Sequence, residues 1–528
     1  MMKKSMSRVL VLGLVLAFSI GAFLGCSKDD DEQDAKNELK NGVTEGSNEG
    51  ETQETEKIVS FQLKNEPLSL DPIVDVDAIT TLVTSNIYEG LVRFDDSNVT
   101  IRPALAESWT VSDDGLEYTF SLRRGVYFHD DSYFDADVVV KNFDRLRQMY
   151  SNSSQWNKKF VEVIESVEKE DQYTVNFVLN HNYTPFLSTL AMSKFTPIVS
   201  PRVIKEGLDV NDNPIGTGPF KFSQWNEGTN IVLEKNSNYW SRKPRIDKID
   251  FRMDVFSTDS AGTMLRNKEL DVVDLDRPRQ LGDDINYYQA DMLMSGFIAL
   301  NCSRPPFNDL SNRLAVAHAI NRAQLYEDEY ADVAILKNSY LPGELKGFDS
   351  SLAFYPFDVE KAQSFSSVAE NTRVTIIDTI FNNNSFNHEI ARSLDRVGFE
   401  AEFIGDLYSS QFKARLNEGN YDVLMFGWRW ENPDPNSLIG FLDQSNPEAN
   451  VSKYFNQELE NLAKKGYSLP NGVERDEVYK KIQELLKEDA VIIPMFELSR
   501  TFAYGSNIRN FRTHPTGRVM FEHMEVVE

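Results

Sequence analysis

Residues and motifs that carry enzyme chemistry are scarce in this sequence. Its 528 residues include two cysteines and six histidines, and the histidines are scattered without metal-ligand spacing. No G-x-S-x-G, H-E-x-x-H or P-loop pattern occurs. Gly216-Thr217-Gly218 lacks the further glycine and helix start of a phosphate cradle, so it predicts a tight turn between strands. Pairs of acidic residues are numerous, so a catalytic pair of carboxylates like that of a glycosidase stays an alternative. On balance the sequence predicts a protein that is not an enzyme and uses no cofactor or metal.

Positive charge is also in deficit. Lys and Arg number 55 against 82 Asp and Glu, which gives a net charge of −27. The charge is uneven: +3 over residues 1–26, −8 over residues 27–56, and −22 over the remaining body. Binding to nucleic acid requires clustered Lys and Arg that neutralise phosphates. The acidic body therefore predicts no nucleic-acid partner.

The N-terminus carries a processing signal. Residues 1–8 are basic, residues 9–24 are apolar, and Gly25-Cys26 closes the run. An apolar segment of about 16 residues is short for a membrane span and suits a signal peptide. The pattern resembles the lipobox of bacterial lipoproteins, although Phe23 stands where leucine is commoner. This resemblance implies a signal peptide over residues 1–25 and a lipid on Cys26. The alternative is ordinary secretory cleavage beside an incidental cysteine.

Residues 26–56 are rich in acidic and small polar residues and contain almost nothing to bury, so they predict a disordered tether. The protein would then be lipid-anchored on the extracytoplasmic face of the cell membrane. If Cys26 is lipidated, Cys302 has no disulfide partner, and we expect it to be a buried small apolar residue.

The remaining body alternates between strand-like and helix-like segments, which is typical of α/β proteins. Its length corresponds to roughly three domain-sized units. Ser112-Asp113-Asp114-Gly115 predicts a turn between two strands. Asp135 is placed to cap a helix over residues 136–149.

Four sequence blocks carry a family resemblance. They are LAESWTVSDDGLEYTFSLRRGVYFHDDSYFDADVVVKNFDR, PIGTGPFKFSQWNEGTNIVLEKNSNYW (Pro214 to Trp240), RNKELDVVD (Arg266 to Asp274) and NCSRPPFNDLSNRLAVAHAINRAQL (Asn301 to Leu325). In this order, behind the lipobox, they resemble the family 5 extracellular solute-binding proteins. Those are the oligopeptide- and dipeptide-binding lipoproteins of ABC importers.

The resemblance implies an α/β fold of the two-lobed periplasmic-binding-protein type, a clamshell of class II, cluster C, with an extra subdomain inserted in lobe I. Lobe I would comprise residues 57–95, 210–298 and 497–528. The inserted subdomain would comprise residues 96–209, and lobe II residues 299–496.

The stretch from Tyr421 to Phe441 supplies the first candidate site residues. Its apolar first part predicts a buried strand over residues 422–428. Pro433 and Pro435 then prevent the chain from continuing the hydrogen-bond ladder of a sheet. Alternation along the strand places Arg429 and Glu431 on one side, and Trp428 and Trp430 on the other. In peptide-binding relatives, a Gly-Trp-x-x-Asp segment supplies the carboxylate that holds the ligand's α-amine. Here the segment is Gly427-Trp428-Arg429-Trp430-Glu431, so the acid is longer by one methylene.

Glu431 is therefore expected to bind a ligand amine, with the two tryptophans as apolar walls. The alternative is that Glu431 pairs with Arg429 and contacts no ligand. The resemblance implies further ligand contacts, with core or loop packing as the alternative. They are Val76, Asp77 and Ala78 on an extended strand, and Leu275, Asp276, Arg277 and Phe297 on the wall of lobe I.

The implied function is capture of a peptide between two lobes and its delivery, by a monomer, to an ABC permease driven by ATPases. Two alternatives stay open. One is a non-peptide ligand such as a nickel chelate or an oligosaccharide. The other is a surface receptor or chaperone-like lipoprotein without transport. The sequence leaves open the ligand's length and side chains, the permease partner and the type of cell envelope.

Overall fold

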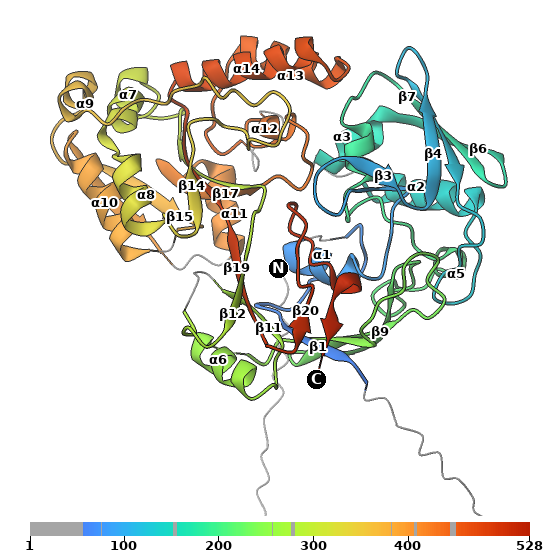
Figure 1. Cartoon of the computed structure of the whole chain (residues 1–528). Coiled ribbons are helices and arrows are strands. Elements are labelled where there is room, and N and C mark those ends of the chain that lie inside the picture. Colours follow the sequence, from blue (N-terminus) through green and yellow to red (C-terminus); the bar gives the residue numbers. More distant parts are fainter. Residues whose placement is uncertain are drawn as a thin grey trace, which may run out of the picture. The chain divides into compact units, whose positions relative to one another are not determined.

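The structure is a computed structural model that describes residues 56–74, 77–150, 156–255, 257–275, 280–381, 383–405, 409–443 and 450–527. Figure 1 shows the chain with its helices and strands labelled. The expected signal peptide and nearly all of the expected tether lie outside these ranges. Within the described residues, no helix is both long enough and apolar enough to cross a membrane.

Lobe I is built on a seven-stranded sheet in the order β12-β19-β11-β1-β10-β9-β8. The central strand β1 runs parallel to β10 and β11, and its Val59 and Phe61 are buried in the core of the lobe. The helices α1 (Ala78–Thr84) and α6 (Thr258–Arg266) belong to this lobe. Its strands are β1 (Ile58–Gln62), β8 (Phe220–Asn226), β9 (Asn230–Lys235), β10 (Lys248–Arg252), β11 (Val272–Leu275), β12 (Asn286–Ala290) and β19 (Arg500–Tyr504).

A second, antiparallel sheet has the order β4-β5-β7-β6 and lies within the expected inserted subdomain. The turn between β4 and β5 occurs at Ser112–Gly115, where Gly115 has φ 74° and donates to the Ser112 carbonyl at 2.9 Å. Asp135 accepts the Val138 N–H at 3.2 Å at the start of α2. β2 (Val92–Phe94) precedes the expected boundary at residue 96 and pairs with β3 (Ile101–Pro103) in a separate two-stranded sheet. The other elements of the subdomain are β4 (Ala106–Val111), β5 (Glu117–Leu122), α2 (Ala136–Tyr150), α3 (Trp156–Val163), β6 (Ile164–Asp171), β7 (Thr174–Leu179), α4 (Phe186–Leu190) and α5 (Pro201–Glu206).

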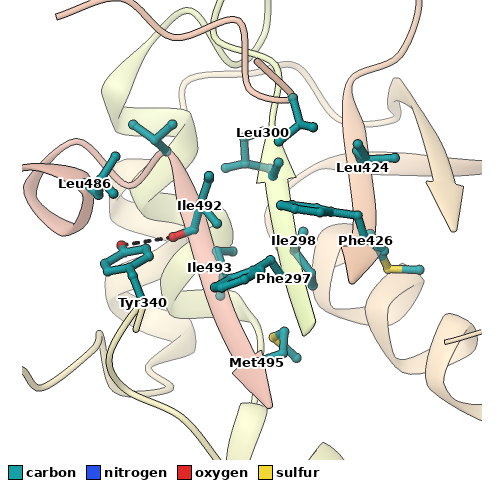
Figure 2. Close-up of a cluster of buried hydrophobic side chains, with 14 of the residues drawn as sticks. Phe297, Ile298, Leu300, Tyr340, Leu424, Phe426, Leu486, Ile492, Ile493 and Met495 are labelled. Carbon is teal, nitrogen blue, oxygen red and sulfur yellow. Dashed lines mark hydrogen bonds between the residues drawn. The ribbon is translucent and has the colours of Figure 1, made fainter. Parts of the chain in front are cut away.

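Lobe II is built on a six-stranded sheet in the order β14-β18-β13-β17-β15-β16. Figure 2 shows its core, where Tyr340 donates to the Ile492 carbonyl at 3.0 Å. The strands are β13 (Met294–Leu300), β14 (Ala334–Leu336), β15 (Thr372–Asp378), β16 (Phe399–Ile404), β17 (Val423–Arg429) and β18 (Ile492–Leu498). The helices are α7 (Leu310–Ala319), α8 (Arg322–Glu329), α9 (Val359–Phe365), α10 (Asn384–Asp395), α11 (Ser409–Glu418), α12 (Ser437–Gly440), α13 (Gln457–Ser468) and α14 (Val473–Glu488).

The chain passes between the two large sheets at two places. It leaves the seven-stranded sheet after β12 and joins the six-stranded sheet at β13, then returns at Ser499 between β18 and β19. The expected boundary at residue 298 is wrong, because it falls inside β13, which pairs with β17 and β18 over its length. The apolar pattern of β13 identifies a strand but does not say which sheet it joins. The C-terminal segment adds β20 (Ile508–Arg509), the short 3-10 helix η1 (Phe521–His523) and β21 (Glu525–Val526).

Candidate functional site

Strand β17 carries the candidate segment to the edge of lobe II. Its residues are buried as far as Phe426, and the last three, Gly427 to Arg429, are half-buried. Both tryptophans contact the Phe441 ring, with ring centroids at 5.0 Å for Trp428 and 6.4 Å for Trp430. The two indoles therefore share one side of the strand, as alternation predicts.

Trp430 is a core residue. Its side chain is 0% exposed, and its indole N–H donates to Ser295 Oγ at 3.1 Å. The expectation that it walls a ligand site is therefore wrong, because its side of the strand faces the interior of lobe II. Trp428, two residues earlier, is nearer the edge and lines a cleft.

Glu431 forms an ion pair with Lys194, which belongs to the inserted subdomain. The side chains are 26% and 13% exposed respectively, so the pair is largely shielded from water. The alternative drawn from the sequence, an ion pair between Glu431 and Arg429, is not what forms. The carboxylate of Glu431 still affects the pKa of Arg429. Burial lowers this pKa, and the negative charge of Glu431 opposes the lowering.

A cleft of about 670 Å³ lies between the inserted subdomain and lobe II. The residues that line it include Asn182, Tyr183, Met192 and Lys194 from the subdomain, and Trp428, Arg429, Glu431, Asn432 and Tyr467 from lobe II. Its two walls also contact each other directly. Tyr183 stacks on Tyr467 with centroids 5.9 Å apart, and Asn432 donates to Thr189 Oγ1 at 3.0 Å.

Three buried polar atoms of the cleft residues have no hydrogen-bond partner within the described part of the chain. They are the indole Nε1 of Trp428 and the Oδ1 atoms of Asn182 and Asn432. Leaving a buried polar group unpaired costs about 1–3 kcal/mol. These three atoms are themselves buried, and Asn182 Oδ1 faces the turn between β4 and β5, 3.2 Å from the position that a Cβ on Gly115 would occupy, so they are not exposed to the cleft.

A smaller pocket of about 40 Å³ adjoins this cleft. Both cavities are lined by Met192, Lys194, Arg429 and Glu431. The smaller pocket adds lobe I residues, among them Ala78 of α1 and Gly517 near the C-terminus. Arg429 reaches this side, since its Nη1 lies 3.5 Å from the position that a Cβ on Gly517 would occupy. The ion pair of Lys194 and Glu431 therefore lies where subdomain, lobe I and lobe II meet.

The other sequence-predicted residues fall into several groups. Asp77 caps α1 by accepting the Thr80 N–H at 2.6 Å, which is a structural role. Leu275 is 4% exposed in the core of lobe I. Gly427 packs closely, because a Cβ there would lie 2.2 Å from Ile380 Cδ1. Val76, Asp276 and Arg277 lie outside the described residues.

Phe297 was expected on the wall of lobe I, and this is wrong. It lies in β13 of the lobe II sheet beside Phe426 (Figure 2) and is 1% exposed. Its ring packs on those of Phe426 and Phe441 with centroids at 5.5 Å in each case. The error follows from the misplaced lobe boundary.

Sequence reasoning missed several residues of the two cavities. They are Asn182, Tyr183, Met192, Lys194, Tyr467, Thr516, Gly517 and Arg518. They come from three separated parts of the chain, and no local pattern marks them. No group of three or more His, Cys, Asp or Glu side chains suited to a metal ion occurs in the ranges that the structure describes.

Two α/β lobes joined by two crossings, with a cleft beside the segment after β17, define a two-lobed solute-binding protein. The model of the bacterial extracellular solute-binding proteins, family 5, matches residues 100–450. The chain belongs to this family.

Known proteins are similar in sequence to this chain along most of its length. The di/tripeptide-binding protein 1 of Pseudomonas aeruginosa is 28% identical over 510 residues, covering 88% of this chain and 94% of that protein. The heme-binding protein A of Haemophilus influenzae is 28% identical over 466 residues, covering 81% and 85%. Among solved structures, the periplasmic binding protein DppA of Helicobacter pylori in complex with the peptide STSA is 27% identical. It covers 89% of this chain and 98% of that one, with a TM-score of 0.77.

Proposed function

We propose that this protein is the substrate-binding component of an ABC importer and captures short peptides. The observation that carries the proposal is the position of Glu431. It occupies the acidic position of the family's amine-binding segment and lines both cavities where the three parts of the fold meet. The peptide named with the Helicobacter pylori relative and the name of the Pseudomonas aeruginosa relative support the same ligand class.

The cleft has the size and polarity that a short peptide requires. About 670 Å³ lies within the range of small-molecule sites. A peptide backbone offers both N–H donors and C=O acceptors, and polar side chains that line the cleft, among them Lys194, Glu431 and Asn432, are suited to bind them. Such backbone contacts would bind peptides of many sequences. Glu431 has two carboxylate oxygens, so it can accept hydrogen bonds from Lys194 and from a ligand ammonium together.

Transport would proceed by binding, closure and delivery. Two interlobe crossings form a hinge about which the lobes close. Ligand binding shifts the equilibrium toward the closed form, and it can do so only by the difference between its binding free energies to the closed and open forms. The closed form would then dock on a membrane permease, whose ATPases supply the energy.

The anchor is part of the proposal. The pattern around Gly25-Cys26 supports a lipid on Cys26, an extracytoplasmic location and a monomer held away from the membrane by residues 26–56. Incorporation of radiolabelled fatty acid tests the anchor, and it should vanish in Cys26→Ala. Labelling that persists in this variant would exclude Cys26 as the attachment site.

The ligand class is tested by denaturing the purified protein and identifying released molecules by mass spectrometry, followed by calorimetry with dipeptides and tripeptides. Recovery of peptides and micromolar or tighter binding is expected. Release of only sugar, metal chelate or heme, together with no heat from any peptide, would refute the proposal.

One observation favours a second candidate, a ligand without an amine. Lys194 already neutralises Glu431, so the site does not require an ammonium from the ligand. The same assays separate the two candidates. Adjacent genes for two permeases and ATPases would favour transport over a receptor or chaperone role.

A further inference from the structure

The C-terminal end of α13 in lobe II is capped by a residue of the inserted subdomain. The last four carbonyl groups of a helix have no donor within the helix, so they need donors from elsewhere. At α13 the Thr184 N–H donates to the Tyr467 carbonyl at 2.9 Å, and Thr184 Oγ1 donates to the Leu469 carbonyl at 2.6 Å. These acceptors belong to the last turn of α13 and to its C-cap. One residue therefore satisfies two carbonyls across the boundary between the subdomain and lobe II.

Three further contacts between the inserted subdomain and lobe II accompany this cap. They are the stacked rings of Tyr183 and Tyr467, with centroids 5.9 Å apart, the hydrogen bond of 3.0 Å from Asn432 to Thr189 Oγ1, and the ion pair of Lys159 and Asp443. An aromatic pair or a hydrogen bond contributes modestly by itself. Contacts that form and break together, however, all act on the same equilibrium between the two parts of the fold.

The inserted subdomain is itself joined to lobe I. The Phe195 N–H donates to the Pro72 carbonyl and the Ile198 N–H to the Glu89 carbonyl, each at 2.9 Å. Rotation about the two interlobe crossings would therefore move the subdomain together with lobe I. Closure brings Thr184 to the end of α13, and opening returns the two carbonyls of α13 to water.

Arg475 connects the capped end of α13 to the segment that carries Glu431. Its guanidinium binds Asp434, three residues after Glu431, and its Nε donates to the Gly466 carbonyl at 2.8 Å. Gly466 directly precedes Tyr467, whose carbonyl Thr184 caps. Among the described residues, Thr184 is not one of those that line the cleft. It can thus act on the cleft only through the position of the subdomain against lobe II.

We propose that Thr184 and the C-terminal end of α13 form a latch that holds the inserted subdomain against lobe II, and so opposes opening of the cleft and release of its ligand. The latch closes through contacts of the chain itself and requires no ligand. Only its effect on ligand release rests on the proposed function. The inserted subdomain then has a role of its own, which is to set how long the two lobes stay closed.

Hydrogen exchange of the Thr184 amide tests the latch without a ligand. This N–H bonds to lobe II, so it exchanges when the subdomain and lobe II separate. In protein freed of ligand by unfolding in urea, dialysis and refolding, we expect exchange at least tenfold slower than in an unstructured peptide of the same sequence. Mass spectrometry with fragmentation to single residues measures the rate.

Two variants weaken the latch from its two sides. Thr184→Val removes the hydroxyl that bonds to Leu469, and Tyr467→Leu removes the stacked ring from lobe II. Each should lower the protection of the residue 184 amide by roughly 2- to 10-fold, as for one hydrogen bond or one aromatic pair. Thr174→Val, in β7, is the matched control, because its hydroxyl bonds at 3.0 Å to Asp171 of the same subdomain.

The effect on ligand release is measured with radiolabelled Ala-Phe. Its dissociation rate should rise by roughly 2- to 10-fold in Thr184→Val and stay unchanged in Thr174→Val. An unchanged rate in a variant whose amide exchanges faster would overturn the link between the latch and ligand release.

The remaining outcomes separate the latch from the peptide function. Exchange of the wild-type amide as fast as in the unstructured peptide, or equally slow in the wild type and both variants, would overturn the latch and leave the proposed function standing. Exchange as expected, with no binding of any dipeptide or tripeptide, would support the latch and refute the peptide function.

Discussion

Lys194 of the inserted subdomain forms an ion pair with Glu431 of lobe II, at the edge shared by the two cavities. The pair joins the subdomain to the segment that we propose binds the ligand's amine. A ligand ammonium must therefore share the carboxylate with Lys194 or displace it. Lys194 Nζ lies where an ammonium ligand would compete for the carboxylate, so affinity for such ligands depends on both residues.

The first prediction concerns this competition. Lys194→Met should raise affinity for peptides with a free N-terminus by about tenfold, because an unpaired, largely buried Glu431 gains more from the ligand ammonium. Glu431→Gln should lower the same affinity by more than tenfold, since one charge-assisted hydrogen bond is worth about 1.5–3 kcal/mol. Calorimetry with matched free and N-acetylated peptides measures both effects.

Lys205→Met, in α5, is the control for removal of a lysine. N-acetylated peptides that bind the wild type as tightly as free ones would show that Glu431 does not hold the amine. Unchanged affinity in Lys194→Met would show that the ion pair does not compete with the ligand.

The sequence blocks were sufficient to predict the family and its two-lobed fold, because these patterns combine strands, turns and glycines that the backbone requires. Gly216 is an example: a Cβ there would lie 2.0 Å from the Ile87 carbonyl oxygen, so glycine permits the close packing of the two segments. The expected tight turn between strands is wrong, because residues 216–218 lead from α5 into β8. Alternation along β17 also placed the two tryptophans on one side. It could not show that Trp430 is covered, because burial depends on Phe441 and on β13.

Contacts between distant segments could not be predicted from the sequence. Lys194 and Glu431 are far apart along the chain, and Lys194 has no recognisable surrounding pattern. A single carboxylate can pair with any cation that the fold brings near it, so the sequence suggested the nearest one, Arg429. The same limitation misplaced Phe297, whose strand could have belonged to either sheet.

The second prediction concerns the loop that follows Glu431. Arg475 of α14 binds Asp434 through two hydrogen bonds of 3.0 and 2.7 Å, and the side chains are 1% and 8% exposed. Breaking such a buried pair leaves an uncompensated charge and costs about 3–5 kcal/mol. Arg475→Met should lower the free energy of unfolding in urea by about this amount.

The control lies on the same helix. Lys480 pairs with Glu477 at 2.8 Å, but the side chains are 37% and 62% exposed. Lys480→Met should change stability by less than about 1 kcal/mol. Equal effects of the two substitutions would contradict a buried, energetically important pair at Arg475.

The third prediction concerns acid stability. His129 Nε2–H donates to the Gly218 carbonyl at 3.0 Å, and its Nδ1 accepts the Gly216 N–H at 3.4 Å. Burial lowers the pKa of His129 to about 4, because the imidazolium would be poorly solvated there. Between pH 6.5 and 4 the unfolded chain binds a proton that the folded chain does not. Stability should therefore fall as pH falls through this window, by up to about 3 kcal/mol from this residue.

Urea unfolding at several pH values measures this loss. His129→Gln should flatten the dependence between pH 6.5 and 4, whereas His388→Gln, exposed on α10, should not. His514, whose pKa burial also lowers to about 4, should contribute a further loss in the same direction. An identical pH slope in wild type and His129→Gln would contradict the buried neutral histidine.

The last prediction uses the two cysteines to test the anchor together with the fold. Burial raises the pKa of the Cys302 thiol to about 11, and its Sγ lies 3.4 Å from the Leu300 carbonyl. At pH 8 only about one thiol in a thousand is then the reactive thiolate. The native protein purified from membranes should therefore react with a thiol reagent very slowly, and it should show one thiol per chain in denaturant, because the proposed lipid on Cys26 would block the other thiol. Two thiols in denaturant would contradict lipidation, and rapid reaction of the native protein would contradict the shielded position of Cys302.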